Sequence, residues 1–441
     1  MSSMVYYAWF DAEEQISDDM NKLAPMLMSL ETFIWDGVEP PEEKLWVALR
    51  KHCPRLRYIG STVGGLPLSE DSELFNFNDL KGFSLIVNYR TRLFLNPDGI
   101  HKFPDALWNM LLDRCSDLEE LILGGERTMY YSPLFDIRPI VHGRWPKLRT
   151  LIFGHTLMQD TSPTVLDWDD MAQEESMKEF SRFISSHPLL AKLHIPYDAR
   201  FPPLEISNSN IVITEFSGTH FYLGYILPFS RLTTLKLCSE RLQTWRLVDL
   251  LPCLRNLRGL STLELWIDMS HRVRADVLHG LTPEKNAAVL ETDHIRVFRP
   301  LLTACDTLLH LKLVCTTEKK FGFRMKDFWK AIEKGPRLRS LEVQKVYSVN
   351  EEKMTRSALK IARRVPTLQA ITLVYAERRW SGLIPIRIKQ KGVYDLCTTS
   401  ENFFRLTAEE SGKGFLKPFS HRTTKICHLQ TFAQRMGRFI S

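Results

Sequence analysis

The chain of 441 residues contains eight cysteines but no C-x-x-C pair. Scattered cysteines in a chain of this length exclude a disulfide framework or a zinc site as the basis of the fold, and they predict reduced side chains in a core. The sequence also lacks an N-x-S/T sequon and a basic start followed by an apolar run, which favours the cytoplasm or the nucleus. The longest uncharged stretch, near residues 216–230, is broken by Gly, Ser, Thr, His and Pro, so no membrane segment is expected.

Motifs of catalysis are missing as well. The sequence has no H-E-x-x-H, G-x-S-x-G or G-x-x-x-x-G-K-[ST]. GSTVGG at 60–65 is not followed by lysine, SGKG at 411–414 has no preceding strand pattern, and DWDD at 167–170 has no further ligands nearby. We therefore expect a protein that is not an enzyme and needs no metal or other cofactor. An α/β enzyme stays as a remote alternative, because distant residues can converge in a fold.

Charge is also limited. The formal net charge is +6 at pH 7, with 44% hydrophobic and 25% charged residues, which is the composition of a folded protein. A charge this small for the length permits a basic patch but does not predict a nucleic-acid partner.

What the sequence has is a repeated phrase. GPRLRSLEVQKV at 335–346 is nearly restated by VPTLQAITLVYA at 365–376, and both contain L-x-x-L-x-L or a close variant. Further copies begin at Leu56, Leu118, Leu148, Leu190, Leu232, Leu260 and Leu308, with degenerate ones at Leu30, Leu80 and Ile213. In five copies a proline stands two residues before the first leucine: Pro54, Pro146, Pro188, Pro336 and Pro366.

The phrase predicts a helix followed by a strand. Proline ends the preceding helix, since it has no N–H to donate and it pushes the residue before it out of the α region. The last two apolar positions then alternate, as a strand with one buried face requires. Helical apolar periodicity precedes several copies, at 40–53, 103–115, 294–305 and 326–335.

One helix and one strand cannot bury their apolar faces alone, whereas stacked copies can. We therefore predict a leucine-rich-repeat solenoid, a ribonuclease-inhibitor-like horseshoe with a concave parallel sheet and convex helices, built from irregular repeats of about 30 residues. A doubly wound α/β domain also alternates helices and strands, but it does not explain the recurrent phrase or the length.

The predicted organisation has four parts. Residues 1–20 form an N-terminal lead-in, residues 21–377 an array of about ten or eleven repeats, residues 378–398 a closing β-hairpin, and residues 399–441 a basic tail. The hairpin is expected to turn near Lys391 and Gly392. Insertions are expected at 61–79, 156–177, 197–210 and 269–294.

The acidic stretch 160–179 is interpreted as a solvated loop that runs into the first turn of a helix, where acids suit the helix dipole. A charged contact loop is the alternative.

If the leucines face the core, the residues between them face the concave surface. The candidate binding face consists of Lys192, His194, Lys236, Glu264, Trp266, His310, Lys312, Glu342 and Gln344. Solenoids bind extended partners on such rows, and a tryptophan among long polar residues is typical of a binding hot spot. The lysines and His310 suggest an acidic protein segment, whereas Glu264 and Glu342 interrupt the row and argue against nucleic acid.

HCPRLRYI at 52–59, HPLLAKLHI at 187–195 and GPRLRSLEV at 335–343 resemble the repeats of fungal F-box/leucine-rich-repeat proteins, as does the closing stretch IRIKQKGVYD at 386–395. The resemblance implies the substrate-recognition subunit of an SCF-type ubiquitin ligase, in which the repeats hold the target and an F-box binds a Skp-type linker. The partners would be that linker and a ubiquitination substrate, and the chain itself would be a monomer.

The sequence departs from this family in two ways. A repeat-like LETFIW begins at Leu30, which leaves too little room in residues 1–29 for an F-box of about forty residues. The Asn or Cys that often follows the repeat phrase is also absent. Either the sequence given begins late or the chain has lost ligase coupling. A free-standing scaffold or inhibitor without ligase coupling is therefore the alternative function.

Overall fold

The computed structural model describes most of the chain and divides it into two compact units, Met1–Thr234 and Leu235–Ser441. The described residues are 3–64, 68–87, 100–125, 134–154, 156–157, 170–195, 210–224, 231–268, 298–316, 325, 328–329, 332, 337–347, 352–377, 387–398 and 404–411.

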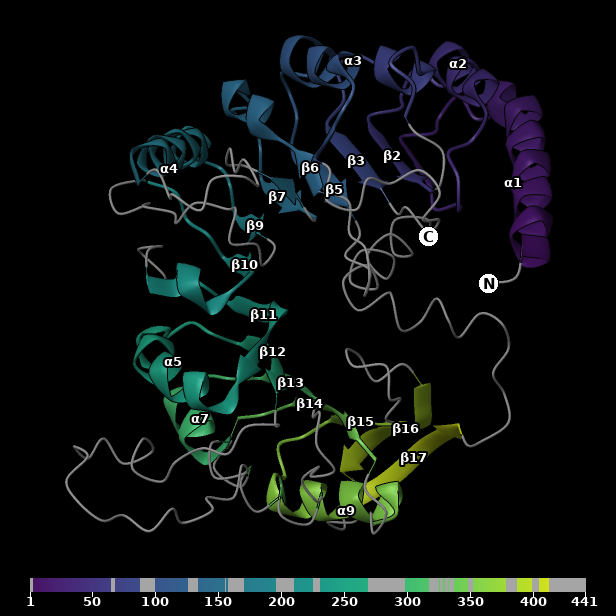
Figure 1. Ribbon diagram of the computed structural model, residues 1–441. Coiled ribbons are helices and arrows are strands. Elements are labelled where there is room, and N and C mark those ends of the chain that lie inside the picture. Colours follow the sequence, from purple (N-terminus) through teal and green to yellow (C-terminus); the bar gives the residue numbers. More distant parts are fainter. Residues whose placement is uncertain are drawn as a thin grey trace. The chain divides into compact units, whose positions relative to one another are not determined.

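The first unit is a mixed α/β structure whose main sheet is parallel throughout (Figure 1). Its strands, in spatial order, are β1 (Thr32–Trp35), β2 (Tyr58–Val63), β3 (Gly82–Val87), β5 (Glu120–Gly125), β7 (Thr150–Phe153), β9 (Lys192–His194) and β10 (Glu215–Ser217). A second parallel sheet contains β4 (Ile100–Lys102), β6 (Leu134–Asp136) and β8 (Thr156–Leu157). The helices are α1 (Ser3–Leu23), α2 (Glu43–His52), α3 (Asp105–Asn109) and α4 (Asp170–Ser185), with short turns η1 (Ala24–Met26), η2 (Glu73–Asn76), η4 (Met110–Arg114), η5 (Arg138–His142) and η6 (His220–Gly224).

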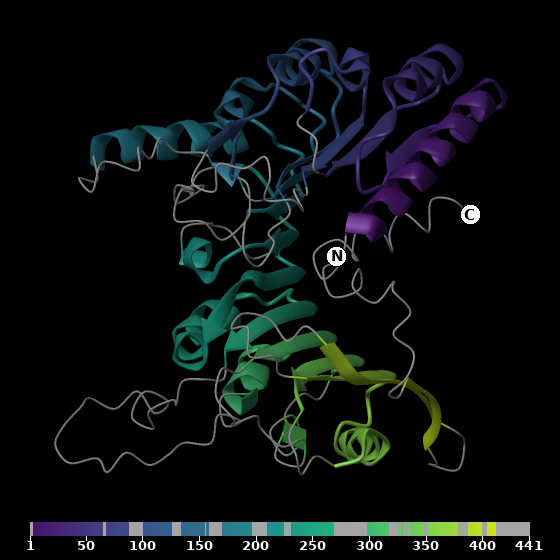
Figure 2. The same ribbon diagram turned by 45° about the vertical axis from the view of Figure 1, so that its right-hand side comes forward.

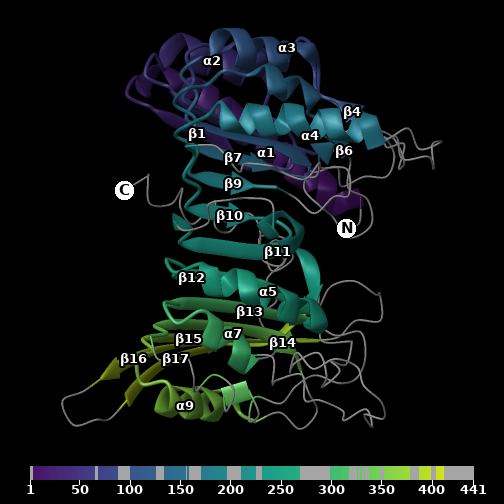
Figure 3. The same ribbon diagram turned by 90° about the vertical axis from the view of Figure 1, so that its left-hand side faces the viewer.

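The second unit has the same α/β character, with its strands stacked in one sheet (Figure 3). The order is β11 (Thr234–Gln243, which starts at the unit boundary), β12 (Thr262–Asp268), β13 (His310–Thr316), β14 (Ser340–Val346), β15 (Ala370–Glu377), β16 (Arg387–Thr398) and β17 (Phe404–Ser411). Strands β12 to β15 are parallel, and the last two strands pair antiparallel. The helices are α5 (Thr244–Asn256), α7 (Phe298–Ala304) and α9 (Met354–Arg364).

Each copy of the repeated phrase carries a strand, as predicted. The strand begins two residues after the first leucine, so that Leu56 precedes β2 at Tyr58 and Leu368 precedes β15 at Ala370. The degenerate copies at Leu30, Leu80 and Ile213 follow the same rule with β1, β3 and β10. The leucines of the phrase are buried, except Leu30, which is half-buried.

The helices predicted from periodicity are also present. Helix α2 buries Leu45, Trp46 and Leu49 against the sheet, and Trp46 packs edge-on against Phe33 of β1. Helix α3 continues into the single π-helical turn η4, a local widening that sequence periodicity does not signal. Within 326–335 only three residues are described, and Pro336 lies outside the described residues.

The entry to most strands is held by one shared carbonyl group. The backbone N–H groups of Arg57 and Tyr58 both donate to Glu31 O, at 2.9 and 3.0 Å, and the same pattern passes from each repeat to the next. The other shared acceptors are the carbonyls of Arg57, Lys81, Glu119, Arg149, Ala191 and Thr214 in the first unit, and of Ser261, Leu309 and Arg339 in the second. Because two donors meet one oxygen, the first residues of neighbouring strands are locked in register.

A tight turn precedes each strand entry. The N–H of the first leucine donates to the carbonyl three residues back, as Leu56 N does to Cys53 O at 3.0 Å. Leu30 N makes the same bond to Leu27 O, and Leu27 is half-buried. In the other copies with this bond the residue three positions before the leucine is buried: Cys53, Cys115, Trp145, His187, Leu257, Cys305 and Val365. Three of the scattered cysteines therefore fill one recurring site in the core, and burial raises the pKa of the Cys305 thiol to about 12.

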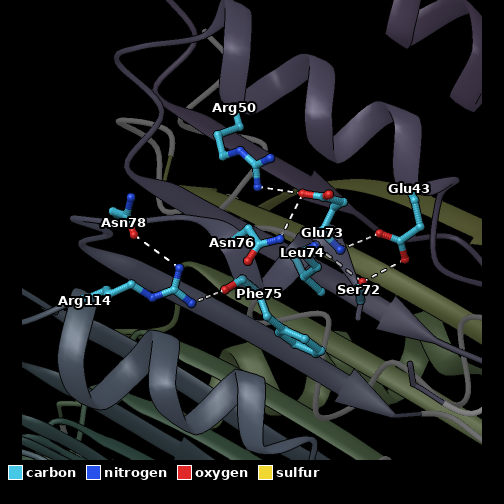
Figure 4. Close-up of polar contacts among 9 residues, drawn as sticks. All are labelled: Glu43, Arg50, Ser72, Glu73, Leu74, Phe75, Asn76, Asn78 and Arg114. Atoms are coloured by element: carbon cyan, nitrogen blue, oxygen red, sulfur yellow. Dashed lines mark hydrogen bonds and ion pairs between the residues drawn. The ribbon is translucent and has the colours of Figure 1, made fainter. Parts of the chain in front are cut away.

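Carboxylates join successive repeats on the helix side (Figure 4). Glu43 of α2 accepts hydrogen bonds from Ser72 Oγ at 2.8 Å and from Glu73 N at 2.6 Å, which caps η2. Glu73 in turn pairs with Arg50 at 2.7 Å. Glu70 accepts from Asp105 N at 3.1 Å at the start of α3. Acids thus satisfy the free N–H groups where the next element begins.

The structure corrects one of the sequence predictions and adds detail to two others. Strand β16 runs straight through Lys391 and Gly392, so the turn expected there is wrong; the hairpin is formed by β16 and β17 instead. The lead-in expected at 1–20 contains helix α1, which extends to Leu23. Helix α4 begins at Asp170, inside the expected insertion 156–177, so the acidic stretch does run into a helix. The alternation pattern predicted a turn at Gly392 because glycine often marks turns, whereas a strand can also continue through a glycine.

His187 predicts a pH-dependent stability. Trp145 N donates to Nε2 of His187 at 3.3 Å, and Nδ1 lies 2.7 Å from the carbonyl of Phe183, to which it must donate. The imidazole is therefore held neutral. Burial lowers the pKa of His187 below its ordinary value of 6.5, against the opposing effect of the Phe183 carbonyl. The stabilisation is fully present above pH ~6.5 and is lost as pH falls toward the folded-state pKa.

We expect His187→Gln to remove this part of the pH dependence. The free energy of unfolding of the natural chain should fall more between pH 7.5 and 5.5 than that of the variant, by up to about 1 kcal/mol. Denaturant unfolding at both pH values measures the difference. His142→Gln is the control, because His142 is exposed. Equal pH dependence of the His187 variant and the natural chain would show that His187 is not the responsible group.

Candidate functional site

The predicted face residues lie on the side of the sheet opposite the core. Burial alternates along the strands, with Leu341 and Val343 inside and Glu342 and Gln344 outside on β14. The nine residues divide between the two units. Lys192 and His194 lie on β9 of the first unit, whereas Lys236, Glu264, Trp266, His310, Lys312, Glu342 and Gln344 lie in the second. We call the outward residues of β12 to β16 the ladder face.

An ion-pair ladder crosses the middle of the ladder face. Glu264, Lys312 and Glu342 occupy matching positions on β12, β13 and β14. Lys312 Nζ lies 3.0 Å from Glu264 Oε1 and 3.9 Å from Glu342 Oε1. The Glu264 side chain is 10% exposed and that of Lys312 26%, while Glu342 is 37% exposed. The lysine therefore neutralises the more buried of the two acids.

A more apolar row runs parallel to this ladder. Trp266, Val314, Gln344 and Val374 are register partners on four successive strands. Trp266 Nε1 donates to Glu264 Oε1 at 3.4 Å, which ties the indole to the ladder. Val314 and Val374 are buried although they point away from the core leucines. Sequence reasoning missed both valines, since they follow the motif, and only strand register places them beside Trp266.

The ladder face continues onto the antiparallel strand β16. Asp395 pairs with Ala370, Val393 with Thr372 and Lys391 with Val374. Asp395 and Lys391 are exposed, whereas Tyr394 between them is buried in the core. His310 lies in the row that leads to Asp395, between Thr262 and Ser340. This outer row is polar and open.

In the first unit the predicted residues are also paired. Lys192 Nζ lies 3.3 Å from Glu215 Oε1 on β10, its register partner, and both side chains are largely buried. His194 pairs in register with Ile152 and Ser217. The lysines proposed to attract an acidic segment are thus already neutralised at Lys192 and Lys312, so the face does not carry the basic row that the sequence suggested.

Tyr58 spans part of the first unit's sheet. Its hydroxyl lies 3.5 Å from Glu119 Oε2, and Lys81 Nζ lies 3.0 Å from Glu119 Oε1. The ring can cross β3 only because residue 82 is glycine, where a Cβ would lie 2.2 Å from the Tyr58 ring. Burial raises the pKa of Tyr58, and the neighbouring carboxylates raise it further. The hydroxyl therefore acts as a neutral donor.

Core positions hold two polar groups of note. Lys345 is buried on β14, next to Cys315 in register, with its Nζ 5.4 Å from the centre of the Tyr375 ring. Burial raises the pKa of the Cys315 thiol to about 12, against the effect of Lys345. A thiol in that state is a poor nucleophile.

Asp136 on β6 pairs with Arg138 Nη2 at 2.6 Å. Burial raises its pKa, but the hydrogen bonds from Arg138 outweigh that effect and leave the pKa of Asp136 below its ordinary value. The described residues include no cluster of three metal-ligating side chains. None of their helices is both long and apolar enough to cross a bilayer.

No family model matches the chain, and no curated protein matches it. Among solved structures the chain is similar to the crystal structure of the Rad7 and Elc1 complex in yeast, with 15% sequence identity and a TM-score of 0.40, over 74% of this chain and 72% of that chain. A likeness at this level carries no argument about function, so the chain's own residues must do so.

The buried ion pair predicts a coupled stability effect. Lys312→Met should lower the free energy of unfolding by about 1–2 kcal/mol, because it leaves the Glu264 carboxylate nearly buried without its cation. Glu264→Gln together with Lys312→Met should cost less than the sum of the single changes, with a coupling of about 1 kcal/mol. Denaturant unfolding of the natural chain, the two single variants and the double variant measures this double-mutant cycle.

The control is Lys147→Met, which breaks an exposed pair with Asp117 at 2.9 Å. This change should alter stability by less than about 0.5 kcal/mol. Additive effects of the two ladder substitutions would show that Lys312 and Glu264 do not interact.

Proposed function

We propose that this chain is a non-enzymatic protein-binding module, a leucine-rich-repeat solenoid whose outward sheet face holds an extended segment of a partner protein. The observation that supports the proposal most directly is the strand register of the second unit. It stacks buried leucines in line on one side and places a row of differing polar and aromatic side chains, Trp266, His310 and Gln344 among them, on the other. Side chains that differ from strand to strand provide specificity for a partner that crosses the strands.

The chemistry of the ladder face defines the class of partner. Its central charges are paired within the protein, so net charge contributes little attraction. Trp266 is half-buried and its indole N–H donates to Glu264, so its ring is fixed in place as the aromatic anchor. His310, Lys391 and Asp395 are exposed and supply polar contacts around it. We infer a polar segment of mixed charge that carries at least one apolar side chain for Trp266.

Ligase coupling is the finer part of the proposal. The repeat phrases resemble those of F-box/leucine-rich-repeat proteins, which implies a role in substrate recognition for an SCF-type ubiquitin ligase. In that role the partners are a Skp-type linker and a ubiquitination substrate, the chain is a monomer, and it works in the cytoplasm or nucleus. The resemblance of residues 52–59, 187–195 and 335–343 supports this part.

Substitutions on the ladder face test the binding surface. We expect His310→Glu with Gln344→Arg to reduce the recovery of partner proteins by about tenfold. The double substitution introduces a negative charge on β13 and a larger, positively charged side chain on β14, where the bound segment would cross these strands. The measurement is quantitative mass spectrometry after affinity purification of the tagged chain from its own source cells.

The matched control is Arg255→Glu, an exposed position on α5 of the same unit. It should leave recovery unchanged, and all variants should keep the thermal midpoint of the natural chain. Equal recovery with the ladder-face variant would contradict binding at this surface.

Ligase coupling has a separate test. A Skp-type linker and a cullin should co-purify with the natural chain and with the ladder-face variant alike, since the linker is not expected to bind on that face. Purification that recovers a partner on the ladder face but neither linker nor cullin would leave a scaffold or inhibitor and remove the ligase role.

A further inference from the structure

Helix α1 and the turn after it carry a row of exposed apolar side chains. Ile16 is 52% exposed and Leu23 is 45% exposed, with Met20 half-buried between them. Met26 in η1 and Met28 just beyond are 79% and 61% exposed. We call these five residues the α1 stripe. Ile16, Met20 and Leu23 have the spacing i, i+4, i+7, so they lie on one side of the helix.

The stripe is not the side that α1 uses for packing. Glu13 accepts hydrogen bonds from Val38 N at 2.6 Å and Glu39 N at 3.0 Å, and Ser17 Oγ accepts one from Glu42 N at 3.2 Å. These bonds fix α1 to the segment that leads into α2. In Figures 1 and 2, α1 lies at the end of the row of helices, beyond α2. The helix is therefore anchored on one side while the stripe beside it stays open.

A group of neighbouring exposed apolar side chains is unusual in the described part of this chain. Among the described residues, the large apolar side chains that are strongly exposed lie on the stripe, except for Val47 on α2 and Leu189 before β9. Single exposed leucines are ordinary on protein surfaces, whereas a contiguous group marks a contact site. Three of the five are methionines, whose flexible side chains adapt to a partner's surface.

The flank of the stripe is acidic. Asp11, Glu14 and Asp19 are exposed on the polar side of α1. The one lysine of this part of the helix, Lys22, already pairs with Asp19 at 3.1 Å. At helical spacing, Glu13 and Asp19 are the acids on either side of the apolar row, and residues 11–23 carry five carboxylates against one lysine, so the helix around the row has net negative charge.

We propose that the α1 stripe binds an amphipathic helix of a partner protein, with apolar residues at i, i+3 or i+4, and i+7 flanked by lysine or arginine. A helix fits because the stripe repeats with helical spacing, so that ridges can pack into grooves along both elements. A second copy of the chain would bring this acidic helix against its own equivalent, and an anionic bilayer would be repelled in the same way. This site is separate from the ladder face and does not depend on the proposed function.

A designed peptide pair tests the proposal with the full chain. The probe is a helical peptide of about 18 residues with a leucine stripe flanked by Lys and Arg, and its match has the same stripe flanked by Glu. Fluorescence anisotropy should show saturable binding of the basic peptide and at least about tenfold weaker binding of the acidic one. Ile16→Ser with Leu23→Ser should weaken the binding of the basic peptide by about tenfold.

Leu189→Ser is the matched control, because Leu189 is 46% exposed in the same unit but lies off the stripe. It should leave peptide affinity unchanged, and each variant should keep the natural thermal midpoint. The proposal is overturned by the absence of saturable binding, by equal affinity for both peptides, or by equal loss in the Leu189 variant. It is also overturned if the stripe variant converts a dimer to a monomer in light scattering, or if it abolishes binding to phosphatidylserine vesicles.

Discussion

The structure of each unit depends on one backbone interaction, the carbonyl that accepts two successive N–H groups from the next repeat. Arg57 and Tyr58 share Glu31 O in the first unit, and Arg339 and Ser340 share Leu309 O in the second. The pair of bonds sets where the following strand starts and which way its first side chain points. Equivalent positions of successive strands are then register partners, so their side chains form rows across the sheet. Both the stack of core leucines and the outward rows follow from this bond.

Variation between repeats is confined to the segments that this interaction does not control. The helix side contains ordinary helices, a π-helical turn and short 3-10 turns. Carboxylates such as Glu13 and Glu43 bridge these different segments by accepting free N–H groups at the start of the next element. The recurring buried position before the first leucine accepts Cys, Trp, His, Leu or Val. A fixed strand entry therefore tolerates uneven repeat lengths, because the chain must only return to the next shared carbonyl.

The outward rows and the α1 stripe present different chemistry. The ladder face is polar, and its buried charges are compensated within the sheet, where the Trp266 indole also donates to Glu264. The α1 stripe is apolar with an acidic margin.

The sequence by itself determined the repeating helix and strand, the burial of the leucines and the strands at Leu30, Leu80 and Ile213, because alternation and proline placement are local properties. The alternation that it predicted is seen in the burial along β14. Only the tertiary structure decided which outward residues meet. Register set Lys312 between two glutamates and put Val314 beside Trp266, although these residues are far apart in the chain. On helix α1, likewise, only the fold shows that Glu13 binds the segment before α2 whereas Ile16 is exposed. Contact with that segment depends on the tertiary structure and not on the local sequence pattern.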